Sequence, residues 1–339
     1  MRHASSRVLA CAAATILMTA APAQAGFNDK NPISYTVDGA TATGYFKVVT
    51  EAINGLIRDV YPGSAATYKP GSPAGGILNI STGQSDFTFN GGGPEIEYAL
   101  DGKAPFKESL KGKFQFVMML HNGLVVHSIM TKDWADQNGI KSYEDIAAKK
   151  PKMRLAVNQP ANLQSTVGMY LAIFGAYGIK EAEVTQGGAS IRANAATGMS
   201  ALRDGKIDVF INGGFVPSSE VIDVSHSRPL QWISSTPEKM KQAGSRWNYD
   251  LFTVKKDAYP FVTKDEITYT QWSAIVAGAH VSEETVYKFV KAMAENEARV
   301  RSIHPTLAGF SVKEAARNST GVAYHPGALR YYREIGLQK

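Results

Sequence analysis

Two short stretches of the sequence carry the same polar residues at the same spacing. Residues 83–92 read GQSDFTFNGG and residues 205–214 read GKIDVFINGG, so Gly, Asp, Asn, Gly and Gly recur at a constant offset of 122 residues. An asparagine amide offers both donors and an acceptor, and the glycines after it let a backbone N–H group approach a small molecule. Asn90 and Asn212 are therefore candidate ligand-binding residues, and their chemistry is that of recognition.

Each repeat also carries an aspartate, Asp86 or Asp208, directly before an apolar run. An aspartate in this position uses its carboxylate to tie a local loop more often than to contact a ligand. We therefore expect both aspartates to be structural.

Further neutral polar side chains stand where helices are expected to begin. Hydroxyl and amide groups beside the free N–H groups of a helix start recognise a carboxylate or another anion without a formal countercharge. The remaining candidate ligand-binding residues are Thr41, Thr43, Tyr45, Ser72, Asn158, Gln159, Gln164, Ser165, Thr166 and Phe215. Simpler roles stay open, because a threonine can be a helix N-cap and Gly-Ser-Pro or Asn-Gly is common in turns.

Motifs for catalysis and metal binding are missing from the sequence. HExxH, GxxxxGK[ST], GxGxxG and GxSxG do not occur, although a catalytic pair assembled only by folding stays open. A structural role is expected for each of the scattered histidines, namely His121, His127, His280, His304 and His325. We therefore expect no enzyme, no cofactor and no metal.

The first 25 residues have the features of a secretory signal peptide. A basic start is followed by a short apolar run and by an AQA cleavage site that ends at Ala25. The apolar run is shorter than the roughly 20 residues of a membrane-spanning helix. We expect an exported, periplasmic protein that begins near Gly26 and lacks cysteine, since the one cysteine is Cys11.

The charge of the chain favours small anions over nucleic acid. The formal net charge is +6, and removal of the leader with Arg2 and Arg7 lowers it by two. Lysine and arginine residues are dispersed along the sequence, so no nucleic-acid partner is expected, whereas a weakly positive field attracts anionic small molecules.

Alternating strand-like and helical stretches predict an α/β fold with parallel sheets and crossover helices. Strands are expected at 33–37, 65–69, 86–90, 114–120, 124–130, 153–157, near 184, at 207–212 and at 267–278. Helices are expected at 43–57, 75–82, 95–100, 163–178 and 193–205, and an amphipathic helix follows from Ser282. The same order of strands and helices occurs twice along the chain. Because the chain is too long for one hydrophobic core, this repeat predicts two lobes.

The expected organisation is a signal peptide over 1–25, a first lobe over 26–124 and 255–339, and a second lobe over 125–254. Ligands of parallel α/β lobes collect at the carboxyl ends of the strands. Two such edges that face each other form a cleft able to close around a small molecule, and we expect the candidate residues to line it.

Five longer stretches carry a family resemblance. They are TATGYF at 41–46, PGSAATYKPGSPAGGILNISTGQSDFTF at 62–89, GIKSYEDIAAKKPKMRLAV at 139–157, LRDGKIDVFINGGFVP at 202–217 and HPGALRYYREIGL at 325–337. In these the chain resembles the solute-binding proteins of TAXI-type TRAP transporters, a branch of the periplasmic binding protein superfamily. The resemblance implies a type II-like periplasmic binding protein fold, with two α/β lobes joined by crossover strands.

The resemblance also implies a function: a periplasmic receptor that captures a small organic anion, a carboxylate or an amino acid, and delivers it to the integral-membrane subunits of a TRAP transporter. We expect the receptor to be a monomer. The ligand of relatives is not carried over, because NQPANLQST at 158–166 stands where the family has a Gly-Ser-Gly-Thr turn. The alternatives are a binding protein of an ABC importer, an exported enzyme acting on a small carboxylate, and a sensor domain.

Overall fold

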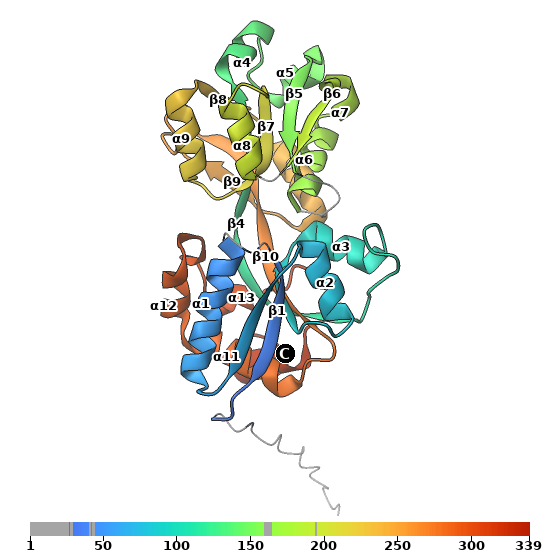
Figure 1. The fold of residues 1–339 in the computed structure, drawn as a ribbon, viewed down its shortest axis with the longest axis vertical. Helices are drawn as coiled ribbons and strands as arrows, with labels where there is room; N and C mark the ends of the chain where they lie inside the picture. Colours follow the sequence, from blue (N-terminus) through green and yellow to red (C-terminus); the bar gives the residue numbers. More distant parts are fainter. Residues whose placement is uncertain (1–26, 28–29, 41, 43–44, 159–164, 194) are drawn as a thin grey trace, which may run out of the picture.

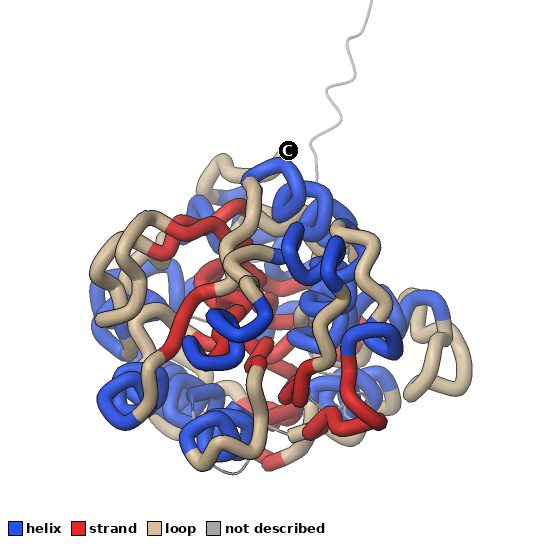
Figure 2. The backbone as a smooth tube through the Cα atoms, turned by 90° about the horizontal axis from the view of Figure 1, so that it is seen from above, coloured by secondary structure: helices blue, strands red, loops and turns tan. Residues whose placement is uncertain are grey.

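The computed structural model describes residues 27, 30–40, 42, 45–158, 165–193 and 195–339. Two α/β lobes lie one above the other, and two long strands run between them (Figure 1). Seen along the long axis, helices lie around the outside of the strands (Figure 2). Among the described residues, no helix combines the length and the apolar character needed to cross a membrane.

The first lobe begins with three parallel strands that alternate with helices, as the sequence predicts. Its elements are β1 (Ser34–Ala40), α1 (Tyr45–Val60), β2 (Ala65–Pro70), α2 (Pro73–Ser81), β3 (Phe87–Gly91) and α3 (Gly93–Asp101). Helix α1 covers one face of these strands together with the end of the chain. Helices α2 and α3 pack on the opposite face.

The second lobe repeats the strand–helix order around three further parallel strands, β5, β6 and β7. Its first elements are α4 (Lys132–Asn138), α5 (Tyr143–Lys149), β5 (Met153–Val157), α6 (Ser165–Ala176), α7 (Glu181–Val184) and β6 (Thr185–Arg192). The later elements are α8 (Ala195–Arg203), β7 (Val209–Gly214), α9 (Ser219–Ser227), β8 (Leu230–Trp232), α10 (Pro237–Gly244), η2 (Ser245–Trp247) and β9 (Leu251–Val254).

The end of the chain returns to the first lobe, as expected. It contains α11 (Glu283–Glu295), α12 (Glu297–Ile303), η3 (Pro305–Leu307), α13 (Val312–Ala315) and α14 (Pro326–Glu334). Ser282 caps α11, because its hydroxyl accepts a hydrogen bond of 3.1 Å from the backbone N–H of Thr285. The apolar face of α11 and Val300 of α12 pack in the same core cluster as α1.

Two antiparallel strands, β4 (Phe114–Thr131) and β10 (Glu266–Gly278), join the lobes. The sequence prediction of two separate strands at 114–120 and 124–130 is wrong, because β4 is continuous over both. The first half of β4 pairs with β10 and the second half pairs with β7 and β8. Asn122 and Gly123 therefore lie in a strand that keeps a partner throughout, with a local register shift in place of a turn.

Strand direction places the carboxyl ends of both sets of strands face to face. Because β10 is antiparallel to β3 and to β4, strands β1 and β3 run in the direction of β4, towards the second lobe. Strand β7 is antiparallel to β4 and parallel to β5, so both point back towards the first lobe. The helix starts that follow these strands therefore meet between the lobes.

Residues 255–265 pack with the second lobe, in contrast to the expected boundary at residue 255. Tyr259 and Val262 are buried in the cluster that contains Met199 and Leu202 of α8. Periodicity could not reveal this, since the segment carries no strand or helix of its own. We therefore place the return crossing within β10.

The repeated phrase has a structural explanation at its aspartates. The carboxylate of Asp86 accepts a hydrogen bond of 2.7 Å from the backbone N–H of Thr36 on β1. That of Asp208 accepts one of 2.8 Å from the N–H of Arg154 on β5. Each aspartate thus fastens the third strand of its lobe to the first, and the prediction of a structural role is confirmed.

The glycines of the repeat are required by conformation and by close packing. Gly83 and Gly205 have φ angles of 76° and 69°, which side chains rarely adopt. A Cβ atom on Gly213 would lie 2.2 Å from a methyl carbon of Thr166 on α6. Gly213 therefore serves the close approach of two protein segments.

Candidate functional site

A cavity of about 380 Å³ lies between the lobes. Its first-lobe wall is the start of α1, and its floor is β4 where this strand crosses. The second lobe contributes α8, the end of β7 and the start of α9. The lining includes Tyr45, Phe46, Leu124, His127, Met199, Phe215 and Ser218. Its volume lies within the range of about 300 to 1,000 Å³ found for small-molecule sites.

An aromatic contact bridges the lobes at this cavity. The ring centroids of Tyr45 in the first lobe and Phe215 in the second are 4.8 Å apart. His121 and His304 lie 5.6 and 6.1 Å from Phe215. The Tyr45 hydroxyl accepts a hydrogen bond of 2.9 Å from Thr306, and burial raises its pKa well above the usual range. Two residues predicted for the site from separate motifs therefore do meet across the lobes.

A second contact between the lobes mirrors the first. A Cβ atom on Gly168 of α6 would lie 2.8 Å from Pro94 of α3 and 3.2 Å from the ring of Trp247. In both contacts the helix that follows the first parallel strand of one lobe, α1 after β1 or α6 after β5, meets the segment that follows the third parallel strand of the other lobe, β7 or β3. The two lobes are thus related by an approximate twofold arrangement.

Glu97 of α3 strengthens this second contact. Its carboxylate pairs with Arg246 and accepts a hydrogen bond of 2.9 Å from the indole N–H of Trp247. Burial opposes the charge, but the hydrogen bonds from Arg246 and Trp247 hold the pKa of Glu97 below its ordinary value. The carboxylate therefore stays ionised near neutral pH and links the lobes.

On the edge of the second lobe, three predicted residues form one network. The Asn158 amide donates to the hydroxyl of Thr166 at 2.9 Å and to the Asn212 carbonyl oxygen at 3.2 Å. The same Asn212 oxygen accepts the N–H of Gly213 at 2.9 Å. Asn212 is only 2% exposed, so its side chain orients the residues around it from below the cleft surface.

On the edge of the first lobe, Ser72 and Asn90 differ in their availability. The Ser72 hydroxyl caps α2 by accepting the N–H of Gly75 at 3.1 Å, a structural role that differs from the turn chemistry considered for Gly-Ser-Pro. Asn90 is half-buried, and the one contact of its side-chain amide with the described residues is a long one of 3.5 Å to the Gly39 carbonyl. Asn90 therefore remains the freer of the two repeated asparagines.

The repeated asparagines belong to different lobes, and neither is among the residues that line the cavity. Gly91, the neighbour of Asn90, pairs with Ala274 of β10, and Ala274 pairs with Met119 of β4. Asn212 pairs with His127 of the same strand β4. Eight residues of β4 thus separate the two levels, which corresponds to at most about 26 Å along an extended strand. Thr41, Thr43, Gln159 and Gln164 lie outside the described residues, as does the side chain of Ser165 at the start of α6.

Sequence reasoning missed Asp38 at the end of β1. Its Oδ2 atom accepts hydrogen bonds from Asn79 at 2.6 Å and from Ser85 at 3.3 Å. Within the described part of the chain the buried Oδ1 atom has no hydrogen-bond partner, and it faces Gly71, where a Cβ atom would lie 2.4 Å away. An Asp-Gly pair that closes a strand was the available signal, but it is equally typical of turns.

The structural role expected of the histidines is confirmed where ring nitrogens bond within the fold. His127 contacts the Tyr259 hydroxyl at 2.7 Å, and burial lowers its pKa to about 4. His304 caps η3, and His325 caps α14. His121 differs from these three. Among the described residues no three His, Cys, Asp or Glu side chains are grouped to hold a metal ion.

Comparison with known proteins agrees with this architecture. A family model, described as the NMT1-like family, matches residues 38–336. MatC from Rhodopseudomonas palustris, solved with bound malate, is 13% identical with a TM-score of 0.53 over 90% of this chain and 97% of that chain. The periplasmic aliphatic sulphonate binding protein SsuA from Escherichia coli is 11% identical with a TM-score of 0.46, over 83% and 81%. The predicted fold, that of a two-lobed periplasmic binding protein, is confirmed.

Proposed function

The chain belongs to the NMT1-like family, and we propose that it is a periplasmic solute-binding receptor which closes its two lobes on a small organic anion. One observation carries the proposal: the carboxyl ends of the two sets of parallel strands face each other across a cavity of about 380 Å³. Contacts such as Tyr45 with Phe215 exist only when the lobes are together. A ligand that touches both walls therefore shifts the population towards the closed form.

We propose that the apolar part of the ligand lies against Phe215 and Met199. Glu220 is exposed and lines the second-lobe end of the cavity, where its charge opposes an anion. The charged group of the ligand is therefore directed towards Asn90 and the other helix starts of the first lobe. The malate bound to MatC makes small carboxylic acids the first compounds to test.

For the membrane partner we propose the integral subunits of a TAXI-type TRAP transporter, on the sequence resemblance at 41–46, 62–89 and 325–337. An ABC importer is the rival, since the same two-lobed architecture serves such systems. Transport in vesicles distinguishes them: uptake driven by an ion gradient without ATP supports the TRAP assignment, and uptake that requires ATP hydrolysis contradicts it. Cell fractionation with amino-terminal sequencing tests export and cleavage near Ala25.

A thermal-shift screen of organic acids and amino acids tests the receptor proposal. A ligand at a hundred times its Kd stabilises the folded form by about 2.7 kcal/mol, which raises the Tm by several degrees. Asn90→Ala should weaken binding of a hit while leaving the Tm of the free protein unchanged. Gln137→Ala, at an exposed position on α4, is the control and should bind as the wild type does.

Two results would contradict the proposal. A screen in which no compound raises the Tm would remove the receptor assignment. A hit that is consumed over time in the presence of the protein would instead favour the exported enzyme. Wild-type affinity in Asn90→Ala would keep the receptor but exclude this residue from the site.

A further inference from the structure

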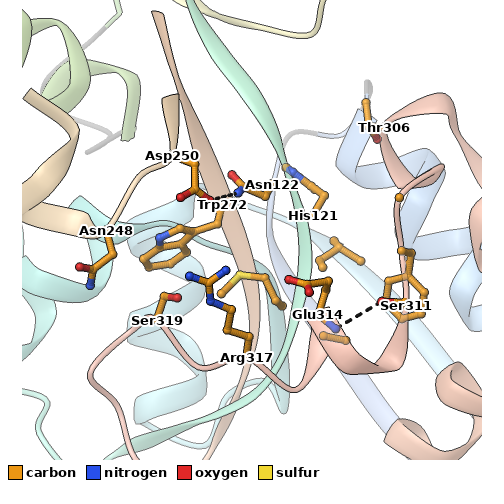
Figure 3. A pocket seen from close by; sticks show the side chains of 15 residues that line it. His121, Asn122, Asn248, Asp250, Trp272, Thr306, Ser311, Glu314, Arg317 and Ser319 are labelled. Atoms are coloured by element: carbon orange, nitrogen blue, oxygen red, sulfur yellow. Dashed lines mark hydrogen bonds between the residues drawn. The ribbon is translucent and has the colours of Figure 1, made fainter. Parts of the chain in front are cut away.

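A separate pocket of about 230 Å³ lies beside the crossing strands, and we call it the hinge pocket. Its polar walls come from β4, from the connector between η2 and β9, and from the chain around α13 (Figure 3). The polar residues used below are His121, Asn122, Asn248, Asp250, Glu314 and Arg317. The hinge pocket and the interlobe cavity share no lining residue.

His121 has an unused pair of ring nitrogens in this pocket. Its side chain is 7% exposed, and among the described residues neither Nδ1 nor Nε2 has a hydrogen-bond partner. Burial, together with nearby His304, lowers its pKa to about 3 and keeps the ring neutral. A neutral imidazole offers one donor and one acceptor, and leaving both unmet in the interior is costly. A hydroxyl or an amide group satisfies one of the two nitrogens, either as donor to the bare nitrogen or as acceptor from the protonated one.

Charges of both signs face the same space. The Asp250 carboxylate accepts a hydrogen bond of 2.9 Å from the Asn122 amide. From the opposite wall, Glu314 and Arg317 extend their charged groups into the pocket (Figure 3). Neither of these two groups bonds to another side chain of the described residues. Carboxylates pair with an ammonium group and a guanidinium pairs with a carboxylate, so the complementary ligand carries both charges.

We propose that the hinge pocket binds a small amino acid with a polar side chain. The carboxylate binds Arg317, the ammonium group lies between Asp250 and Glu314, and the side-chain hydroxyl or amide bonds to His121. The volume of about 230 Å³ corresponds to that of about eight water molecules in the liquid, which suits serine or asparagine.

The position of the pocket gives the bound amino acid a regulatory consequence. Asn248 and Asp250 belong to the connector of the second lobe, whereas Glu314 and Arg317 belong to the first. The occupant therefore touches both lobes outside the cleft. If it binds the closed form more tightly than the open form, it raises the affinity of the cleft for its own ligand, and the effect is reciprocal.

The test follows the His121 imidazole by NMR in the mature protein labelled with ¹⁵N-histidine, with His121→Gln to assign the signal. L-serine and L-asparagine should shift this signal saturably at millimolar concentration. L-alanine, which lacks the side-chain hydroxyl or amide, should bind more weakly, and so should acetate and methylamine, which each lack two of the three matched groups. Arg317→Gln should weaken L-serine binding about tenfold or more, which is the effect of losing a hydrogen bond to a charged group.

Two control variants separate this site from the cleft. Lys313→Gln, on α13 but outside the pocket lining, should bind L-serine like the wild type. Asn90→Ala should also leave the His121 response unchanged, whatever its effect on the cleft ligand. No His121 shift with either amino acid, or equal affinity in Arg317→Gln, would overturn the proposal. Binding lost in Asn90→Ala and kept in Arg317→Gln would place the amino acid in the cleft instead.

Discussion

Replacing Phe215 by alanine tests whether the aromatic contact holds the lobes together. Phe215 is the second-lobe member of a ring cluster whose first-lobe members are Tyr45, His121 and His304. One aromatic pair contributes about 0.5 to 1.5 kcal/mol beyond its buried area. Taking about 1.4 kcal/mol for this half-buried ring, we expect Phe215→Ala to raise the ratio of open to closed molecules about tenfold.

Distances between spin labels on the two lobes measure this ratio. The expected mature chain lacks cysteine, so labels attach only at introduced positions. Val48 on α1 and Leu171 on α6 are 55% and 46% exposed, which makes them suitable sites for cysteine in the two lobes. Without ligand, pulsed electron–electron double resonance should show a larger population of long label-to-label distances, which represent the open form, in Phe215→Ala than in the wild type.

A matched control removes a ring pair that lies within one lobe. Phe261 stacks on Tyr259 with a centroid distance of 5.5 Å, and both pack in the second lobe. Phe261→Ala should leave the distance distribution unchanged. An unchanged distribution in Phe215→Ala, or the same broadening in both variants, would refute the reasoning. Where the open population grows, the apparent Kd of a cleft ligand should rise in proportion to the loss of the closed form.

Three further predictions concern the framework of the site. Burial lowers the pKa of His127 to about 4, so the unfolded state takes up a proton first as the pH falls below about 6.5, and the free energy of unfolding should drop by up to about 1.4 kcal/mol per pH unit until about pH 4. In urea unfolding, His127→Gln should show a shallower dependence of this free energy on pH. An equal dependence in the variant and the wild type would contradict this prediction. Asp208→Asn should lower the free energy of unfolding by about 1 to 2 kcal/mol, since a charged acceptor for a strand N–H is lost, whereas Asp204→Asn on the surface should change it little; equal midpoints would exclude the strand-fastening role. Gly213→Ala should lower the free energy of unfolding by about 1 to 3 kcal/mol through overpacking. Gly175→Ala, which has open space around it, should stabilise α6. A higher Tm for Gly213→Ala than for Gly175→Ala would show that the close contact at Gly213 does not destabilise the fold when a methyl group is added.

Local sequence signals predicted the strands, the helices and the duplication well, because each depends on short-range periodicity. Tyr45 and Phe215 were assigned to the cleft from separate stretches, and they are in contact. The repeated asparagines show the limit of such reasoning. Asn90 and Asn212 occupy matching places in the repeat, yet in the described ranges it is Asn212 whose side chain is engaged by a neighbouring amide, that of Asn158. Identical motifs thus acquire different roles from tertiary neighbours.

Long-range pairing decided the features that the sequence could not reveal. The sequence predicted two strands, at 114–120 and 124–130, but pairing with β10 carries β4 through the residues between them. Both ring nitrogens of His121 lack hydrogen-bond partners among the described residues, and no sequence signal predicts this. The reason is that it depends on which groups the chain around α13 brings near β4. The boundary near residue 255 moved for a similar reason, since Tyr259 packs into the second lobe.

The seam around Trp247 bears on how the molecule opens. Trp247 lies in one continuous apolar cluster that includes Ile96 of α3 and Met169 of α6, whereas the contact at Phe215 borders an empty space. Separating the lobes evenly would expose that cluster to water, but a rotation about an axis near Trp247 would keep it intact. The parts of the two lobes beside α1 and α9 should therefore move farthest when the lobes open. A membrane partner that senses the occupied receptor would detect the angle between these two parts.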